Sequence, residues 1–188
     1  MKTFAISGRC IAAPPPADWR EQLAQMLGAK PRRIGTWAEL GLYGALRCMA
    51  DAREKTLAAD AQIWLGSRRG TYAATATVLD QLREDLPMPL AFLQTQPSQL
   101  LALLAAQLDW YSHACFVAGA GPQALLRLAA AQASSDGLLL GWVDEMDGGS
   151  TNWLRLRAGA ATEKDIVAAT SSEMTMLNAT YVQAGRAA

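Results

Sequence analysis

Short apolar runs alternate along the chain with segments in which apolar residues recur every three or four positions. The uninterrupted runs predict buried strands, and the recurring spacing predicts amphipathic helices. Strands are expected at residues 2–13, 61–65, 112–118, 138–143 and 152–157. Helices are expected at 19–27, 37–56, 71–85, 99–108 and 122–133, with Asp18, Thr36 and Ser98 as N-caps and Pro122 at a first helical position.

The alternation of strands with helices predicts an α/β fold, with a mixed, mostly parallel sheet covered by helices on both faces. The helix at 122–133 is so rich in alanine and leucine that we expect it to be buried. Residues 90–95 follow two prolines and are expected to be irregular. The strand at 152–157 alternates tryptophan and arginine with leucine, which predicts a half-exposed edge strand. Residues 158–188 are rich in alanine and threonine, and a helix capped by Thr162 is one interpretation of them.

Composition narrows the classes of protein. The chain has 188 residues, 51% of them hydrophobic and 18% charged, and its net charge is +0, which argues against a nucleic-acid-binding surface. The longest fully apolar run, 100–106, is too short to span a membrane, and the first residues do not resemble a signal peptide. Because the three cysteines are scattered, we expect free thiols and a cytoplasmic protein. They are Cys10, Cys48 and Cys115.

The chain contains a single histidine, His113, which limits nucleophilic and metal chemistry. A Ser-His-Asp or Cys-His arrangement would have to use it, and no CxxC or HExxH spacing predicts a metal site. His113 and Cys115 are two positions apart on an expected strand, so their side chains should point the same way. The pair could act as a thiolate and imidazolium, or Cys115 could be a small core residue.

Two other polar segments follow expected strands. Gly66-Ser67-Arg68-Arg69-Gly70 lies between a strand and a helix, where it could bind a phosphate or form a tight turn. Asp144, Glu145 and Asp147 follow another strand, where carboxylates could perform acid–base work or lie in a solvated loop.

The turn Gly119-Ala120-Gly121 joins an expected strand to the alanine-rich helix. Such a turn permits close backbone packing, and the following helix N-terminus can activate a nucleophile. However, no serine, cysteine or threonine occurs between Cys115 and Ser134. The turn is therefore present without a nucleophile.

Taken in order, several segments resemble the N-terminal half of a β-ketoacyl synthase of the thiolase superfamily. They are the helix at 33–52, the Gly-Ser-x-x-Gly turn at 63–70, the Pro-x-x-Phe stretch and helix at 89–108, the nucleophile strand, elbow and central helix at 113–129, and the strand end at 140–146. The resemblance implies a thiolase-like half-fold with a buried central helix over residues 1–157. Residues 158–188 would be a C-terminal extension packed on the same domain.

Two departures from the family pattern bear on activity. The family's catalytic cysteine aligns near Ala118 or Gly119, and its two histidines belong to a C-terminal half that this chain does not contain. The resemblance therefore implies a non-catalytic chain length factor, paired with an active β-ketoacyl synthase in aryl polyene, polyketide or fatty-acid-type elongation. Ala118, Gly119, Ala120 and Gly121 would be a vestigial nucleophile elbow. The dimer strand would comprise Ser112, His113, Ala114, Cys115, Phe116 and Val117.

The resemblance also implies that the helix after the Gly-Ser-x-x-Gly turn borders the partner's acyl pocket. The gate candidates on this helix are Thr71, Tyr72, Ala74, Thr75 and Val78. The basic residues Arg32, Arg33, Arg68 and Arg69 could attract an acidic acyl carrier protein, and no cofactor or metal is expected. Two alternatives stay open, a small acyltransferase or thioesterase using Cys115 and His113, and a homodimeric acyl-binding module.

Overall fold

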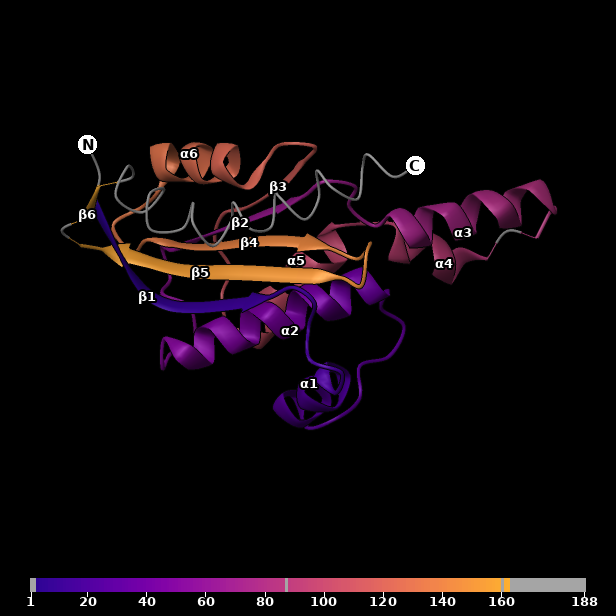
Figure 1. Ribbon diagram of the computed structural model, residues 1–188, viewed down its shortest axis with the longest axis horizontal. Coiled ribbons are helices and arrows are strands. Elements are labelled where there is room, and N and C mark those ends of the chain that lie inside the picture. Colours follow the sequence, from indigo (N-terminus) through magenta and orange to yellow (C-terminus); the bar gives the residue numbers. More distant parts are fainter. Residues whose placement is uncertain (1–2, 87, 160, 163–188) are drawn as a thin grey trace.

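The computed structural model describes residues 3–86, 88–159 and 161–162, which form a mixed sheet between layers of helices (Figure 1). Within these residues the strand order is β3-β2-β4-β5-β1-β6. Strands β3, β2 and β4 are parallel, and β5 pairs antiparallel with both β4 and β1, so β1 runs in the same direction as the parallel group. The predicted mixed, mostly parallel sheet is confirmed. The strands are β1 Thr3–Ala12, β2 Gln62–Ser67, β3 Ala114–Ala118, β4 Leu138–Asp144, β5 Ser150–Ala158 and β6 Ala161–Thr162.

Helices cover both faces of the sheet, as expected. Helix α6 lies on one face, whereas α2 packs on the other with α1 and α5 against it (Figure 1). The expected burial of the central helix at 122–133 is wrong for its outer side, because α6 buries only the side that faces the sheet and Leu128 on the other side is 46% exposed. The most deeply buried helix is α2. The helices are α1 Trp19–Leu27, α2 Thr36–Asp51, α3 Tyr72–Arg83, α4 Pro89–Gln94, α5 Ser98–Gln107 and α6 Pro122–Gln132.

Several local expectations were wrong. Residues 89–94 are helical rather than irregular, because Pro89 occupies the first turn, where a missing N–H costs nothing. Thr36 and Ser98 lie inside their helices instead of capping them, and the Asp18 side chain makes no capping hydrogen bond. Asp18 instead accepts a hydrogen bond from Gln22, and Thr36 accepts one from the Arg20 guanidinium. Helix α2 ends at Asp51, five residues earlier than expected.

Strand β5 is central rather than an edge strand, because it lies between β4 and β1. The edge-strand prediction rests partly on placing Arg155 at the surface, but this residue is 1% exposed. Its Nε donates to both carboxylate oxygens of Glu54 at 3.1 Å, and its Nη1 donates to the main-chain oxygens of Asp136 and Leu156 at 3.0 and 2.9 Å. These partners neutralise a charge that the sequence pattern had placed at the surface.

Helix α2 approaches the sheet closely because small residues face the Trp153 ring. A Cβ on Gly141 of β4 would lie 2.5 Å from that ring, and Gly44 of α2 also faces it. Trp37 at the start of α2 donates from its indole to the Val143 carbonyl at 3.0 Å. Helix α2 is therefore fixed against the carboxyl end of β4.

The remaining expectations on architecture concern the chain end and membranes. Thr162 lies in β6, which pairs with β1. The helix expected after Thr162, and the rest of the C-terminal extension, lie outside the described residues. None of the helices in the described part of the chain is long and apolar enough to cross a membrane.

Candidate functional site

The carboxyl ends of the parallel strands meet at the edge of the sheet from which α3 and α4 project (Figure 1). Strand β2 ends at Ser67 and enters the Gly-Ser-x-x-Gly turn, while β4 ends at Asp144. The 3%-exposed Asp144 accepts hydrogen bonds from Ser67 Oγ at 2.9 Å, the Arg68 main-chain nitrogen at 3.0 Å and Trp142 Nε1 at 2.9 Å. The acidic segment is thus a buried structural anchor at Asp144, not a solvated loop.

The same contacts decide between the two interpretations of the glycine-rich turn. Ser67 Oγ accepts a hydrogen bond from the Gly70 main-chain nitrogen at 2.8 Å. The main-chain nitrogens of Arg68 and Gly70 are therefore satisfied within the protein, next to the Asp144 carboxylate, which disfavours an anion. The geometry supports a tight turn rather than a phosphate site.

Glu145 follows Asp144 and is half-buried beside the start of two helices. Its Oε1 accepts a 2.7 Å hydrogen bond from the main-chain nitrogen of Ala73, in the first turn of α3, and the main-chain nitrogen of Trp37, in the first turn of α2, acts to lower its pKa. Burial raises the pKa of Glu145, and the neighbouring Asp144 carboxylate adds to the increase. Sequence reasoning found these carboxylates but not this role, because their partners come from elements far apart along the chain.

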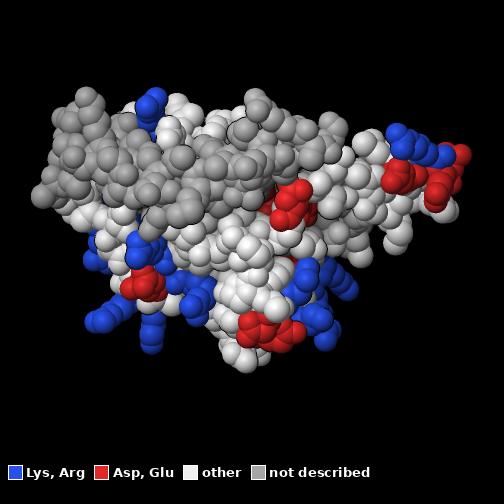
Figure 2. Space-filling model, viewed as in Figure 1, with Lys and Arg blue, Asp and Glu red and all other residues white. Residues whose placement is uncertain are grey.

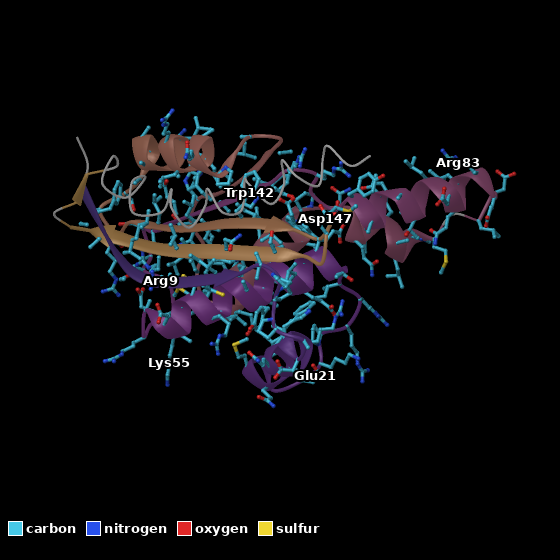
Figure 3. All side chains as sticks on the ribbon, viewed as in Figure 1. Arg9, Glu21, Lys55, Arg83, Trp142 and Asp147 are labelled. Carbon is cyan, nitrogen blue, oxygen red and sulfur yellow. The ribbon has the colours of Figure 1, made fainter. Side chains whose placement is uncertain are left out.

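Helices α3 and α4 pack against each other and form a projection from the sheet edge, here named the α3–α4 arm (Figure 1). In Figure 3, Arg83 marks its far end, and Asp147 lies at the sheet edge from which it projects. None of the residues of either helix is fully buried. At the base, Thr71 Oγ1 donates to the Thr95 carbonyl at 2.7 Å and joins the two helices.

The five gate candidates lie on two different faces of the arm. Thr71, Ala74 and Val78 recur at spacings of three and four, and they are buried or half-buried. Tyr72 and Thr75 are exposed and belong to another face. The structure therefore places all five on the arm but does not gather them around one point.

The outer face of the arm is apolar. The exposed residues of α3 on this face recur at spacings of three, four and three, which is the seam of an amphipathic helix. They are Tyr72, Thr75, Leu79 and Leu82, here named the α3 stripe. In the space-filling view the arm is largely uncharged except at its tip (Figure 2). Eight large apolar side chains are roughly half-exposed here, namely Tyr72, Leu79, Leu82, Leu86, Met88, Leu90, Phe92 and Leu93.

This apolar arm was not identified from the sequence, although its three-and-four spacing was visible there. The sequence pattern of an apolar helix face predicts burial, and only the fold shows whether other residues cover that face. Large apolar side chains concentrated on one projection are typical of a surface that meets a partner.

Strand β3 is the edge strand of the sheet and pairs with β2 alone among the described strands. Residues 114–117 are half-buried, whereas Ser112 and His113 precede the strand and are exposed. The expected dimer strand therefore begins two residues later than predicted. Its free edge offers main-chain donors and acceptors to another strand.

The turn after β3 has the geometry of a strand-to-helix elbow. Gly119 adopts φ +76 and its main-chain nitrogen donates to the Ser67 carbonyl at 3.0 Å, while Ala118 ends β3 and Gly121 precedes α6. A Cβ at Gly119 or Gly121 would meet nothing within 4 Å. The elbow therefore has room for side chains that its residues do not supply.

The three cysteines do not form an activated pair in the described contacts. The Cys115 Sγ lies 3.9 Å from the Phe116 carbonyl, while the His113 ring lies 5.9 Å from the Trp64 ring. Burial raises the pKa of Cys10 to about 11 and raises that of Cys48 further. These two thiols are therefore poor nucleophiles at neutral pH.

The basic residues singled out from the sequence lie on two separate loops. Arg32 and Arg33 lie between α1 and α2, and Arg68 and Arg69 lie in the turn before α3. All four are exposed, and the Arg69 guanidinium lies 5.5 Å from the centre of the Tyr72 ring. Among the described residues, no group of three or more histidine, cysteine or acidic side chains is placed to hold a metal ion.

The fold is similar to that of solved chains from complexes of a ketosynthase with a chain length factor, as the family resemblance predicts. A chain of the ketosynthase ApeO in complex with its chain length factor ApeC from Xenorhabdus doucetiae superposes with a TM-score of 0.56 at 18% identity, covering 85% of this chain and 81% of that one. No protein-family model matches the chain, and no curated protein matches its sequence.

Two further solved structures share this fold. One is AntDE:AntF, a type II polyketide synthase acyl-carrier protein in complex with its ketosynthase bound to the hexaketide, with a TM-score of 0.62 at 12% identity over 84% of this chain. The other is the ishigamide ketosynthase/chain length factor, with a TM-score of 0.56 at 14% identity over 76%. The chain spans 63% and 47% of the length of these two chains, respectively.

Proposed function

We propose that this protein is a non-catalytic, chain-length-factor-like subunit that pairs with an active β-ketoacyl synthase and borders its acyl pocket. The observation that carries the proposal is the α3–α4 arm, because an uncovered apolar projection of this size is costly for a protein that acts alone. The fold shared with ketosynthase–chain length factor complexes supports the same conclusion. Residues 1–157 would form the ketosynthase-like domain.

The free edge of β3 would pair with the matching strand of the partner across a pseudo-two-fold axis. Residues Ala114 to Val117 are half-buried and apolar, so pairing would satisfy their main-chain groups and cover their side chains together. The arm begins next to the carboxyl end of this strand, since the Gly119 main-chain nitrogen is bonded to Ser67 at the end of β2. One partner could thus cover both the β3 edge and the arm.

In this assembly the arm would limit the acyl chain in the partner's pocket. The buried or half-buried positions Thr71, Ala74 and Val78 face the inside of the arm, whereas Tyr72 and Thr75 belong to the exposed α3 stripe. Exposed side chains are the ones that a pocket in another subunit can meet. We therefore expect Tyr72 and Thr75 to influence product length more than Ala74 and Val78.

The condensation chemistry would belong to the partner. Gly119 stands at the elbow position where a nucleophile is expected, and glycine has no side chain to hold an acyl group. The exposed arginines 32, 33, 68 and 69 would favour approach of an acidic acyl carrier protein without binding its acyl group.

Co-expression tests the proposal directly. The tagged chain is purified with and without an untagged β-ketoacyl synthase from the same genome, and the mass of the complex is measured. We expect a 1:1 heterodimer, and poor yield or aggregation of the chain alone. A monomer or homodimer that binds none of the ketosynthases offered would overturn the proposal and favour the acyl-binding module.

Within a heterodimer, Tyr72→Trp and Thr75→Trp should shorten the product, and Ala74→Trp and Val78→Trp serve as controls on the inner face of the same helix. Unchanged product length in Tyr72→Trp and Thr75→Trp would refute the gate on the α3 stripe. A heterodimer that forms normally in that case would leave the subunit assignment standing.

A further inference from the structure

We propose that Asp144 and Glu145 are positioning residues that fix the direction in which the α3–α4 arm leaves the sheet. The inference rests on the proposed function for its effect on product length, but the anchor itself is a property of this chain alone. Two consecutive carboxylates at the end of β4 contact the turn and the helix that together form the base of the arm.

Glu145 lies beside the N-termini of two helices that have no capping side chain of their own. Helix α3 has Thr71 at its N-cap position and α2 has Gly35, and neither makes a side-chain capping hydrogen bond. The Glu145 carboxylate accepts from the main-chain nitrogen of Ala73, in the first turn of α3, at 2.7 Å, and the main-chain nitrogen of Trp37, in the first turn of α2, is close enough to lower its pKa. The side chain thus satisfies an orphan donor of α3 from a position beside the start of α2. It thereby ties the arm to the end of β4.

Asp144 holds the other side of the base. It accepts from the Ser67 hydroxyl and the Arg68 main-chain nitrogen, in the turn that enters α3, and its second oxygen accepts from the Trp142 indole. Because Asp144 is 3% exposed, its hydrogen bonds with Ser67 and Trp142 are buried and that with Arg68 is partly buried. The turn therefore cannot rotate without breaking hydrogen bonds to a buried charge.

A small change of angle at the base of the arm would become a large displacement at its tip. Helix α3 has 12 residues and is therefore about 18 Å long. Outside the base it packs mainly against α4, which moves with it. A tilt of about 10° at the base would displace the tip by about 3 Å, given this length. Such a displacement would move the α3 stripe relative to any pocket it borders.

Hydrogen–deuterium exchange of the full chain tests the anchor without a partner. The variants are Glu145→Ala, which removes the acceptor, Glu145→Gln, which keeps an oxygen acceptor without the charge, and Asp147→Asn, a control at an exposed carboxylate two residues away. We expect exchange in peptides of α3 and α4 to accelerate about tenfold in Glu145→Ala, while Glu145→Gln and Asp147→Asn stay within about twofold of the parent.

Two results would overturn the anchor. One is unchanged arm exchange in Glu145→Ala, and the other is a uniform acceleration over the sheet and the arm, which a purely structural role would produce. If Glu145→Ala does not fold, exchange is measured in Asp144→Asn instead. We expect acceleration confined to α3 and α4 in that variant.

Product analysis of the heterodimer tests the consequence. Glu145→Ala should broaden the distribution of product lengths at a total turnover within about twofold of the parent, and Glu145→Gln should restore a single length. A lower yield with an unchanged length distribution would refute the positioning role. If no heterodimer forms with any ketosynthase, the proposed function fails, whereas the exchange result still decides the anchor.

Discussion

The Ser67 hydroxyl donates a 2.9 Å hydrogen bond to the Asp144 carboxylate across two neighbouring parallel strands. The two residues are 77 positions apart, and both are buried at the carboxyl end of their strands. Asp144 also accepts from the Arg68 main-chain nitrogen and the Trp142 indole. The entrance to α3 therefore depends on one buried charge.

Asp144→Ala should lower the free energy of unfolding by about 3 kcal/mol, because it leaves two buried donors and one partly buried donor without their charged acceptor. Urea denaturation followed by circular dichroism measures the change. Asp147→Asn is the matched control, since Asp147 is exposed with φ 55, a conformation that asparagine tolerates. We expect the control to stay within about 0.5 kcal/mol of the parent. Equal losses in both variants would contradict the role of Asp144.

The buried pair of Arg155 and Glu54 gives a second prediction. Glu54→Ala should destabilise the protein by about 3 kcal/mol or more, because it leaves the 1%-exposed Arg155 guanidinium without its counter-ion. Arg157 also contacts Glu54 but its side chain is 53% exposed, so Arg157→Ala should cost less than about 1 kcal/mol. Thermal and urea unfolding of both variants test this. A similar small cost in both would show that the Glu54 contact with Arg155 is not required.

Glu145 should make stability depend on pH. Burial raises its pKa in the folded state, so the folded protein binds this proton more tightly than the unfolded chain does. The stability that this proton contributes to the folded state is fully present below the ordinary pKa of about 4.5. It is lost as the pH rises through the raised pKa of the folded state. Glu145→Gln removes this dependence and keeps an acceptor.

The melting temperature of Glu145→Gln minus that of the parent should therefore increase between about pH 4 and about pH 7. Differential scanning fluorimetry across this range measures it, and the shared titrations of other carboxylates cancel in the difference. A difference that stays constant with pH would contradict the raised pKa of Glu145.

Alkylation separates the subunit assignment from the small-enzyme alternative. With the pKa of Cys10 raised to about 11 and that of Cys48 raised further, both thiols should react with iodoacetamide far more slowly than in the unfolded chain at pH 7.5. We expect Cys115 to react no faster than it does in the unfolded chain, because no described contact pairs it with His113. Mass spectrometry locates the adducts, and the same chain in urea serves as the control. Fast labelling of Cys115 that His113→Ala abolishes would support a Cys-His enzyme.

The α3 stripe should be the part of the arm that a partner covers. Leu79→Asp should weaken the heterodimer at least tenfold, because it places a charge in an apolar contact. Thr77→Asp is the control, since Thr77 is exposed but points to another side of α3. Co-purification and analytical ultracentrifugation measure both. Equal weakening by the two variants would show that the stripe has no special role.

Most elements were predictable from the sequence because their signals are local. The uninterrupted run at 138–143 and the helix after Pro122 appear in the structure close to where they were expected, as β4 and α6. The errors arose where a distant residue changes the meaning of a local pattern. Arg155 made β5 resemble an edge strand, and its contact with Glu54 explains how this arginine can be buried in a central strand.

The candidate site shows the same difference between local signals and contacts made by distant residues. The sequence identified the Gly-Ser-x-x-Gly turn, the carboxylates after β4 and the elbow without a nucleophile, since each is a short run of residue types. It gave no sign that Asp144 and Glu145 accept hydrogen bonds from Ser67 and Ala73. Those contacts depend on three segments meeting at one sheet edge.

By itself, the sequence determined the α/β class, the order of most strands and helices and the resemblance to ketosynthases. Hydrophobic spacing and turn residues act within a few positions, so these features can be recognised locally. The tertiary structure alone decided that α3 and α4 project with an apolar stripe that no other described residue covers. The same helix pattern would be buried in another arrangement, and exposure is a property of what packs nearby rather than of the helix. Tertiary packing likewise decided the partners of Asp144 and Glu145, since strand pairing brings together residues that are distant along the chain.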